Sequence, residues 1–211
     1  ASESIFSLGN GRMGQRANFE ESYSGDTLPG NYIGGIYYPD KTKVGWWKNG
    51  YPEYYAKVLN APSWIGIRFN IDGYELDLAE CGINDFYRVL DMKQGHLERS
   101  FRAILPGNKM VKVKATRFLS IVDDETGNIR YEITPENFTG QFQVTLDLDA
   151  DIMNEDANYN EKFWDEVDKT ASAANRATLT AKTKKLDFRV TLGMDFSMYV
   201  NDEHMEPKVE P

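Results

Sequence analysis

The feature that most constrains this fold is an alternation of apolar and polar residues that turns back on itself at Asp72-Gly73. Residues 65–71 and 74–78 alternate on either side of that pair. A two-residue hairpin loop needs positive φ at both positions, which Asp-Gly supplies. The loop sets the cross-strand pairs Ile71–Tyr74, Asn70–Glu75, Phe69–Leu76, Arg68–Asp77 and Ile67–Leu78. One face is then mostly apolar and the other polar, as in a half-buried antiparallel sheet.

The same period of two recurs along the chain between turn residues. The further expected strands are 86–92, 97–105, 110–122, 129–133, 142–148 and 186–196. The alternation slips near Arg117 and Phe118, which predicts a bulge there. Regular short strands with turn punctuation indicate a sandwich or barrel. We therefore expect an all-β fold, a large antiparallel β-sandwich with one short helical excursion.

A glycine motif near the start suggests a competing fold. Gly9, Gly11 and Gly14 have the G-x-G-x-x-G spacing of a dinucleotide-binding loop. Such a loop must lie between a strand and a long helix, and residues 15–25 lack the apolar stripe of a helix. The spacing therefore predicts a structural glycine turn between strands.

Charge argues against a nucleic-acid partner. The 211 residues carry a formal net charge of -9, whereas phosphate binding needs clustered Lys and Arg. One basic run exists, made of Arg99, Arg102, Lys109, Lys112, Lys114 and Arg117. Because it alternates like a strand, we expect a solvated strand face.

Other composition limits the chemistry further. Cys81 is the only cysteine, which excludes a disulfide framework and suits a buried small apolar residue. Two histidines without a CxxC pattern predict no zinc site. No apolar run approaches the roughly 20 residues of a membrane span, so we expect no membrane partner.

Two stretches break the strand rhythm. Residues 32–64 form an aromatic insertion that Gly and Pro interrupt, and we expect a long loop. Residues 151–175 form an acidic excursion, where a short helix beginning near Asn160 would place Phe163, Trp164 and Val167 on one face.

These two stretches supply the candidate site residues. Aromatic rings beside polar groups suit a small polar ligand such as a sugar. The candidates for a sugar cleft or an interface are Trp46, Trp47, Tyr51, Asn158, Tyr159, Asn160, Phe163 and Trp164. The alternative is that these rings pack the insertion against the sandwich. Nearby carboxylates from Asp147 to Asp156 could serve hydrolysis, or they could be a solvated face.

Several motifs resemble the amino-terminal part of glycoside hydrolase family 65. They are IFSLGNGRMGQRANFEE, TLPGNYIGGIYYPD, KVGWWKNGYPEYYAKVLNAP, FYRVLDMKQGHLERSF, VKATRFLSI, IRYEITP and NEDANYNEKFW. The resemblance runs from about Glu3 to Phe196, and the order of the motifs is more specific than any one of them. PDKTKVGWWKNGYPEYY and ANYNEKFW are most similar to the maltose phosphorylases of the family.

The resemblance implies an architecture and a reaction. Family members open with a galactose-mutarotase-like super-sandwich, followed by a catalytic (α/α)6 barrel. The implied reaction is phosphorolysis of an α-linked glucose disaccharide with inversion. Inorganic phosphate is then a co-substrate and one barrel glutamate is the acid, so no cofactor and no metal are implied. From the resemblance we expect that residues 1–211 lack the barrel and end before the sandwich of the family is complete.

We therefore expect residues 1–211 to be an N-terminal β-sandwich domain, cut short at its carboxyl end and without a catalytic residue. Its implied partners are its own barrel, the disaccharide and, in the full-length protein, a second copy in a homodimer. A bacterial cytoplasmic location is implied. The alternatives are a free-standing carbohydrate-binding module and a purely structural domain whose aromatic segment is an interface.

Overall fold

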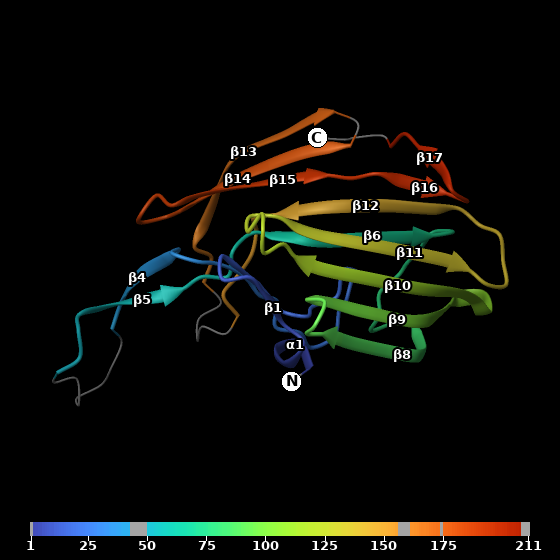
Figure 1. Cartoon of the computed structure of the whole chain (residues 1–211), viewed down its shortest axis with the longest axis horizontal. Coiled ribbons are helices and arrows are strands. Elements are labelled where there is room, and N and C mark those ends of the chain that lie inside the picture. The colour runs from blue at the N-terminus through green and yellow to red at the C-terminus, as the bar shows by residue number, and fades with distance from the viewer. Residues whose placement is uncertain (1, 43–49, 156–160, 174, 208–211) are drawn as a thin grey trace. The chain divides into compact units, whose positions relative to one another are not determined.

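The computed structural model describes residues 2–42, 50–155, 161–173 and 175–207, and their regular secondary structure is almost entirely antiparallel strands (Figure 1). The chain divides into two compact units. Unit 1 comprises residues 1–34 and 65–147, and unit 2 comprises residues 35–64 and 148–211. The all-β expectation is therefore confirmed.

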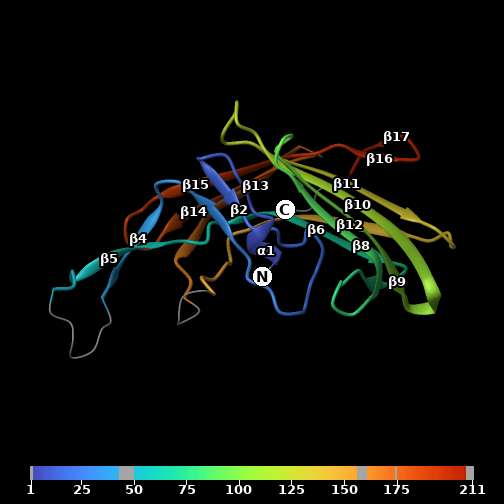
Figure 2. The same ribbon diagram turned by 60° about the horizontal axis from the view of Figure 1, so that its bottom comes forward.

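The larger sheet of unit 1 has four strands in the order β11-β10-β9-β8. Their bounds are β8 (Gly82–Asp91), β9 (His96–Leu105), β10 (Lys109–Leu119) and β11 (Gly127–Pro135). Figures 1 and 2 show them side by side as one twisted sheet. In β9 and β10 every second residue is buried, because successive side chains in a strand point to opposite faces.

A second sheet of unit 1 has the order β12-β6-β7. Its strands are β6 (Ser63–Ile71), β7 (Tyr74–Glu75) and β12 (Phe142–Asp149). The buried faces of the two sheets share one hydrophobic core, in which Ile71 and Leu76 from the second sheet's hairpin meet Phe101, Val111 and Val113. The packing of two apolar faces makes unit 1 a sandwich.

The Asp72-Gly73 turn forms as the sequence predicts. Asp72 and Gly73 have φ of 51° and 88°, and Ile71 pairs with Tyr74 and Asn70 with Glu75. Beyond that point the expected register is only partly kept, because β7 ends at Glu75.

Other partners replace the expected Arg68–Asp77 pair. Arg68 instead binds Asp147 through two hydrogen bonds of 2.5 and 2.7 Å. Asp77 accepts hydrogen bonds from the backbone N–H of Ser24 and of Ala79.

The bulge expected near Arg117 and Phe118 does not form, since β10 pairs with β9 and β11 in unbroken register there. The apparent slip arises because Arg117 occupies a buried position. A register shift occurs instead in β8, between Asn84 and Tyr87, where Asp85 has a φ of 53°. A bulge in an edge strand discourages pairing with another chain.

The amino-terminal segment adds a short helix and a small sheet to unit 1. Helix α1 (Ser2–Ile5) precedes β1 (Leu8–Gly9), β2 (Met13–Gln15) and β3 (Asn31–Ile33), and the sheet order is β1-β2-β3. Residues 15–34, all of which the structure describes, contain no helix after Gly14. The exclusion of a dinucleotide-binding domain is therefore confirmed.

Unit 2 also consists of antiparallel strands. They are β4 (Tyr37–Lys41), β5 (Tyr54–Val58), β13 (Trp164–Ala173), β14 (Arg176–Thr183), β15 (Arg189–Asp195), β16 (Met198–Val200) and β17 (Glu203–Met205). β4 pairs with β5, β14 lies between β13 and β15, and β16 pairs with β17.

Two expectations for unit 2 are corrected. Residues 32–64 are not one long loop, because β4 and β5 form a hairpin within them. The short helical excursion within residues 151–175 is not formed by residues 161–173, since pairing with β14 draws Trp164–Ala173 into a strand. Its expected start near Asn160 lies outside the described residues.

Candidate functional site

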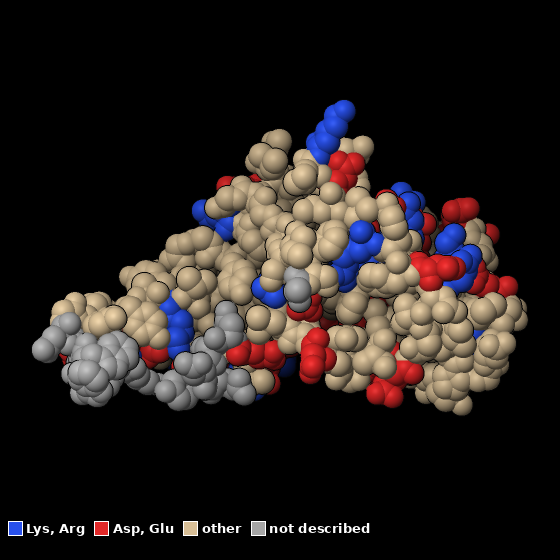
Figure 3. All heavy atoms as spheres, turned by 90° about the horizontal axis from the view of Figure 1, so that it is seen from below, with Lys and Arg blue, Asp and Glu red and all other residues tan. Residues whose placement is uncertain are grey.

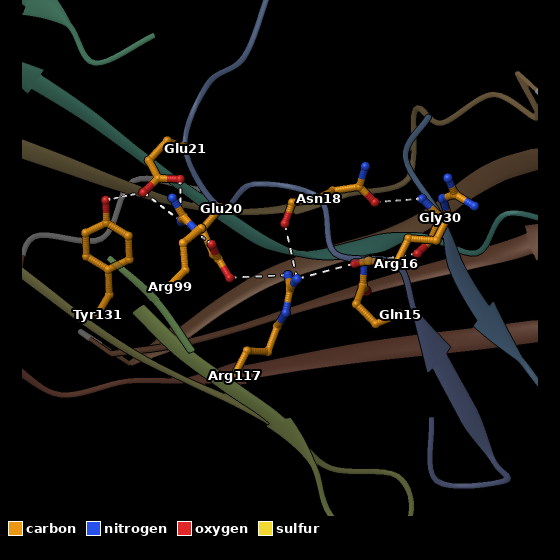
Figure 4. A network of polar contacts seen from close by, with 9 residues as sticks. All are labelled: Gln15, Arg16, Asn18, Glu20, Glu21, Gly30, Arg99, Arg117 and Tyr131. Carbon is orange, nitrogen blue, oxygen red and sulfur yellow. Dashed lines mark hydrogen bonds and ion pairs between the residues drawn. The ribbon is translucent and has the colours of Figure 1, made fainter. Parts of the chain in front are cut away.

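A buried polar network lies on the inner face of the larger sheet of unit 1 (Figure 4). The segment after β2 brings Glu20 and Glu21 against Arg99 of β9 and Arg117 of β10. Both carboxylates and both guanidinium groups are almost fully removed from solvent, with side chains no more than 4% exposed. Burial of ionised groups is costly unless they are paired, so the pairing decides whether this segment folds onto the sheet.

Arg99 joins the two glutamates. Its Nη2 lies 2.5 Å from Oε2 of Glu20 and 2.8 and 2.6 Å from the two carboxylate oxygens of Glu21. Tyr131 of β11 donates a 2.5 Å hydrogen bond to Oε1 of Glu21. Arg99, Arg117 and Tyr131 therefore hold the Glu20-Glu21 pair inside the unit.

Arg117 binds the backbone of the same segment. Its Nη2 donates to the carbonyl oxygens of Arg16 at 3.3 Å and Asn18 at 3.1 Å, and its Nη1 lies 3.3 Å from Oε1 of Glu20. That last contact is an ion pair without hydrogen-bond alignment. Arg16 and Asn18 lie outside the strands, so their carbonyl oxygens have no sheet partner at this point. Arg117 supplies hydrogen-bond donors to these carbonyl groups.

The network keeps Glu20 ionised. Burial raises the pKa of Glu20, but the positive charges of Arg117 and Arg99 outweigh burial and hold its pKa below the ordinary value. Burial lowers the pKa of Arg99, yet Glu21 and Glu20 raise it above its ordinary range. Burial and the Glu21 charge together raise the pKa of Tyr131 well above its ordinary value.

This arrangement suits clamping and not proton transfer. A general acid or base works best with a pKa near the operating pH, and Glu20 lies far from that condition. Arg99 already occupies Oε2 of Glu20 and both carboxylate oxygens of Glu21, and Arg117 pairs with Oε1 of Glu20. The network therefore anchors residues 16–21 to strands β9 to β11.

The glycine motif forms a hairpin that docks on the turn between β10 and β11. Oδ1 of Asn10 accepts hydrogen bonds from the N–H groups of Arg12 and Met13, while its Nδ2 donates to the carbonyl oxygens of Ser120 and Asp124. Among the three motif glycines only Gly11 has a positive φ, at 90°. A structural role for the motif therefore rests on Gly11 and Asn10.

The structure describes three of the eight predicted site residues. Tyr51 is 53% exposed, whereas Phe163 and Trp164 are 4% and 6% exposed. The other five, Trp46, Trp47, Asn158, Tyr159 and Asn160, lie outside the described residues.

Phe163 and Trp164 pack inside unit 2. The ring of Phe163 lies 4.5 Å from that of Tyr38 and beneath the ammonium group of Lys57 at 5.0 Å, and Trp164 donates a 2.8 Å hydrogen bond to the carbonyl of Asn60. Their placement favours packing within the unit. Val167, expected on the same face, is 44% exposed, its neighbours in β13 are also exposed, and it lies at a register shift of that strand.

The basic run divides between the two faces of the sheet. Lys112 and Lys114 are exposed as expected, but Arg99 and Arg117 are 3% and 1% exposed. The solvated-face expectation is therefore wrong for these two arginines, because each pairs with a buried carboxylate. On the face drawn in Figure 3, acidic and basic side chains lie interspersed.

Three further features of the described part of the chain concern metal ligands, helix length and the thiol of Cys81. No group of three or more His, Cys, Asp or Glu side chains there is placed to hold a metal ion. None of its helices has the length and apolar character needed to span a bilayer. Cys81 is half-buried, and burial raises the pKa of its thiol, so it is a poor nucleophile.

The burial of the two arginines could have been predicted from their alternate positions along the strands. Arg99 shares its phase with Leu97, Phe101 and Leu105, and Arg117 shares its phase with Val113 and Leu119. Arginines in phase with core residues require buried carboxylates, and Glu20-Glu21 is an acidic pair close to a glycine hairpin. The pairing itself joins residues about 80 positions apart and has no local signature.

Comparisons with known proteins identify the family. The family model described as the glycosyl hydrolase family 65 N-terminal domain matches residues 1–210. The chain is 48% identical over 183 residues to a maltose phosphorylase of Bacillus subtilis (strain 168), covering 86% of this chain and 24% of that protein. It is 31% identical over 204 residues to an α,α-trehalose phosphorylase of Thermoanaerobacter brockii, covering 92% and 26% respectively.

A solved structure described as a putative kojibiose phosphorylase from human microbiome has the same fold. It aligns with a TM-score of 0.82 and 26% identity over 98% of this chain and 28% of that one. The chain spans about a quarter of the length of the curated relatives that it matches. It therefore belongs to glycosyl hydrolase family 65, of which it forms the N-terminal domain.

Proposed function

We propose that this chain is the non-catalytic N-terminal domain of an inverting α-glucoside phosphorylase of the maltose type. The observation that carries the proposal is the 48% identity to a maltose phosphorylase, against 26 to 32% for the kojibiose and trehalose phosphorylases. In this proposal the domain packs on a catalytic barrel and supports the sugar cleft or the interface of a cytoplasmic homodimer.

The buried network supports a scaffolding role. Its charged groups are engaged with one another, so they contribute a fixed shape to unit 1 and leave the chemistry to the barrel. The reaction needs one carboxylic acid to protonate the leaving oxygen, because inorganic phosphate replaces the activated water of an inverting hydrolase. That acid belongs to the barrel, and no cofactor is required.

The β4–β5 hairpin is the part of unit 2 best suited to a cleft or an interface. Tyr51 and Tyr54 are each 53% exposed, and Tyr55 is 44% exposed. Tyrosine is enriched at interfaces and in sugar-binding clefts because its ring packs while its hydroxyl group forms a hydrogen bond. Lys57, held by Asp40 at 2.7 Å and Glu161 at 3.0 Å, fixes the base of this hairpin.

The test is a phosphorolysis assay of the uninterrupted gene product. We expect phosphate-dependent release of glucose and formation of β-glucose 1-phosphate from maltose, with less from trehalose, kojibiose and nigerose. Release that proceeds equally without phosphate would identify a hydrolase and contradict the proposal. A clear preference for another disaccharide would contradict the maltose assignment alone.

Residues 1–211 by themselves provide the second arm of the test. We expect no turnover of maltose or of glucose 1-phosphate by this part of the protein. Calorimetric titration with maltose, trehalose and glucose distinguishes an accessory domain from a free-standing carbohydrate-binding module, because only the module should bind a sugar unaided.

A further inference from the structure

Arg88 of the edge strand β8 lies beside the buried network but forms no ion pair with its carboxylates. It pairs across the strands with Arg99, so two positive side chains lie on the same face in adjacent strands. Like charges placed directly opposite one another are destabilising unless an anion compensates them. The carboxylates of Glu20 and Glu21 are engaged by Arg99 and Arg117.

Arg88 forms no ion pair with a carboxylate of the described residues, although Glu20 and Glu3 act on its charge from a greater distance. Its Nε is buried without a hydrogen-bond partner, and no described carboxylate lies within 4.0 Å of its guanidinium group. Glu3, another carboxylate in this region, is held by Arg16 at 3.8 Å and by Thr27 at 2.5 Å. Burial and the positive charges of Arg99 and Arg117 lower the pKa of Arg88, and Glu20 and Glu3 offset this only in part.

Aromatic rings surround this guanidinium group. Its central carbon lies 5.9 Å from the ring centre of Phe6, 5.0 Å from that of Phe19 and 5.4 Å from that of Phe86. Phe86 is 46% exposed, and Ile5 beside Phe6 in the chain is 71% exposed. We call these five residues, Ile5, Phe6, Phe19, Phe86 and Arg88, the Arg88 patch.

The composition of the Arg88 patch is that of an interface centre. Aromatic residues and arginine are enriched where interfaces bury most of their energy. A half-buried guanidinium group without an ion pair selects an acidic partner, and the exposed phenylalanine and isoleucine select an apolar one. The partner surface must therefore present a carboxylate among apolar side chains.

The relatives indicate which molecule supplies that partner. This chain covers only 24 to 26% of the maltose and trehalose phosphorylases that it matches. We propose that the Arg88 patch is a docking site for a carboxylate-bearing apolar segment from the part of the same polypeptide that family 65 proteins carry beyond this domain. The proposal rests on the proposed function and adds to it the surface that receives that part.

Carbodiimide crosslinking of the full-length protein tests the proposal. Arg88→Lys keeps the positive charge and introduces an amine that carbodiimide can join to a carboxylate in contact with it. We expect mass spectrometry to find position 88 linked to an Asp or Glu beyond residue 211 of the same chain. Arg130→Lys is the matched control, because Arg130 is exposed and has Glu132 at 2.7 Å, which should be its crosslink.

Three crosslinking results would overturn the proposal. One is a link from position 88 to a carboxylate within residues 1–211, and another is no link from position 88 while the control links to Glu132. The third is a link between two copies, recognised by mixing isotopically heavy and light protein, which would assign the patch to a dimer contact.

Hydroxyl-radical footprinting of the unsubstituted full-length protein gives an independent measurement. Phe86 belongs to the Arg88 patch, whereas its neighbour Tyr87 is 53% exposed and pairs with Ser100 on the opposite face of the sheet. The oxidation rate of each side chain is divided by its rate in the unfolded protein, which corrects for the different reactivity of Phe and Tyr. We expect the corrected rate of Phe86 to be at least about 10-fold lower than that of Tyr87 when the patch is covered. Similar rates would contradict docking, whether or not the protein phosphorolyses a disaccharide.

Discussion

Two buried arginines carry the most demanding interactions in this domain. Arg99 and Arg117 occupy core positions of β9 and β10, where a side chain cannot reach water. Each is tolerated because the Glu20-Glu21 segment supplies negative charge and backbone carbonyls at the same place. Removing one partner from such a set leaves a charge both buried and uncompensated, which costs more than the pair contributes.

Glu20→Gln should therefore destabilise unit 1 strongly. The substitution keeps the shape but removes the charge between Arg99 and Arg117, and we expect a loss of about 3–5 kcal/mol in the free energy of unfolding at pH 7. Urea unfolding, monitored by amide hydrogen exchange in β9 and β10, measures this loss of free energy. Glu132→Gln, at an exposed pair with Arg130, is the control and should cost less than about 1 kcal/mol.

The same variant predicts an acid dependence. Because the folded pKa of Glu20 is lowered from about 4.5, its contribution to stability is complete above that pH and is lost as the pH falls through the folded pKa. The stability difference between the unsubstituted protein and Glu20→Gln should therefore shrink below pH 4.5. A difference that stays constant down to pH 2 would show that charge is not its cause.

Tyr131 predicts the opposite dependence, at alkaline pH. Its folded pKa is raised well above 10.0, so its contribution is complete below pH 10.0 and decreases as the pH rises toward the folded pKa. Tyr131→Phe removes the hydrogen bond to Glu21 and should cost about 2 kcal/mol at pH 7. Urea unfolding at pH 7 and pH 11 should show this cost diminished at the higher pH, and an unchanged cost would contradict the mechanism.

The stability of the glycine hairpin depends on the positive φ of one residue, Gly11. Gly11 has a φ of 90° with no atom within 4 Å of an added Cβ, so Gly11→Ala should lose about 1–2 kcal/mol through backbone strain alone. Gly14→Ala is the matched control, because Gly14 lacks a positive φ and an added Cβ would meet Tyr32 at an ordinary 3.8 Å. Thermal unfolding that ranks the two variants equally would contradict this account.

Local sequence predicted elements well where the deciding interactions were local. The turn at Asp72-Gly73 needed only the φ preference of two residues. The helix expected around Phe163 is not formed by residues 161–173, because the pairing of Trp164–Ala173 with β14 decides the conformation there. The Arg68–Asp77 pair failed because Asp147, from a distant strand, binds Arg68 instead.

The candidate site was harder to predict than the fold. Period-two alternation predicts one apolar and one polar face, and this division places every basic residue from Arg99 to Arg117 in solvent. Two of them belong to the apolar face and depend on glutamates about 80 to 100 residues earlier. Their partners become visible only once the sheets are assembled, since nothing in the segment around Glu20 specifies which strand it crosses.

Charge across the whole molecule sets how copies of it behave toward one another. The formal net charge of -9 at pH 7 keeps molecules apart, and it vanishes near the isoelectric point of about 4.8. Glu20 remains ionised there, because its pKa lies below the ordinary value, so the buried network is intact when surface repulsion disappears. We therefore expect a solubility minimum near pH 4.8 that does not involve unfolding. Precipitate collected at that pH should redissolve at pH 7 with an unchanged far-ultraviolet circular dichroism spectrum, whereas an altered spectrum or lasting insolubility would show that the network fails before repulsion does.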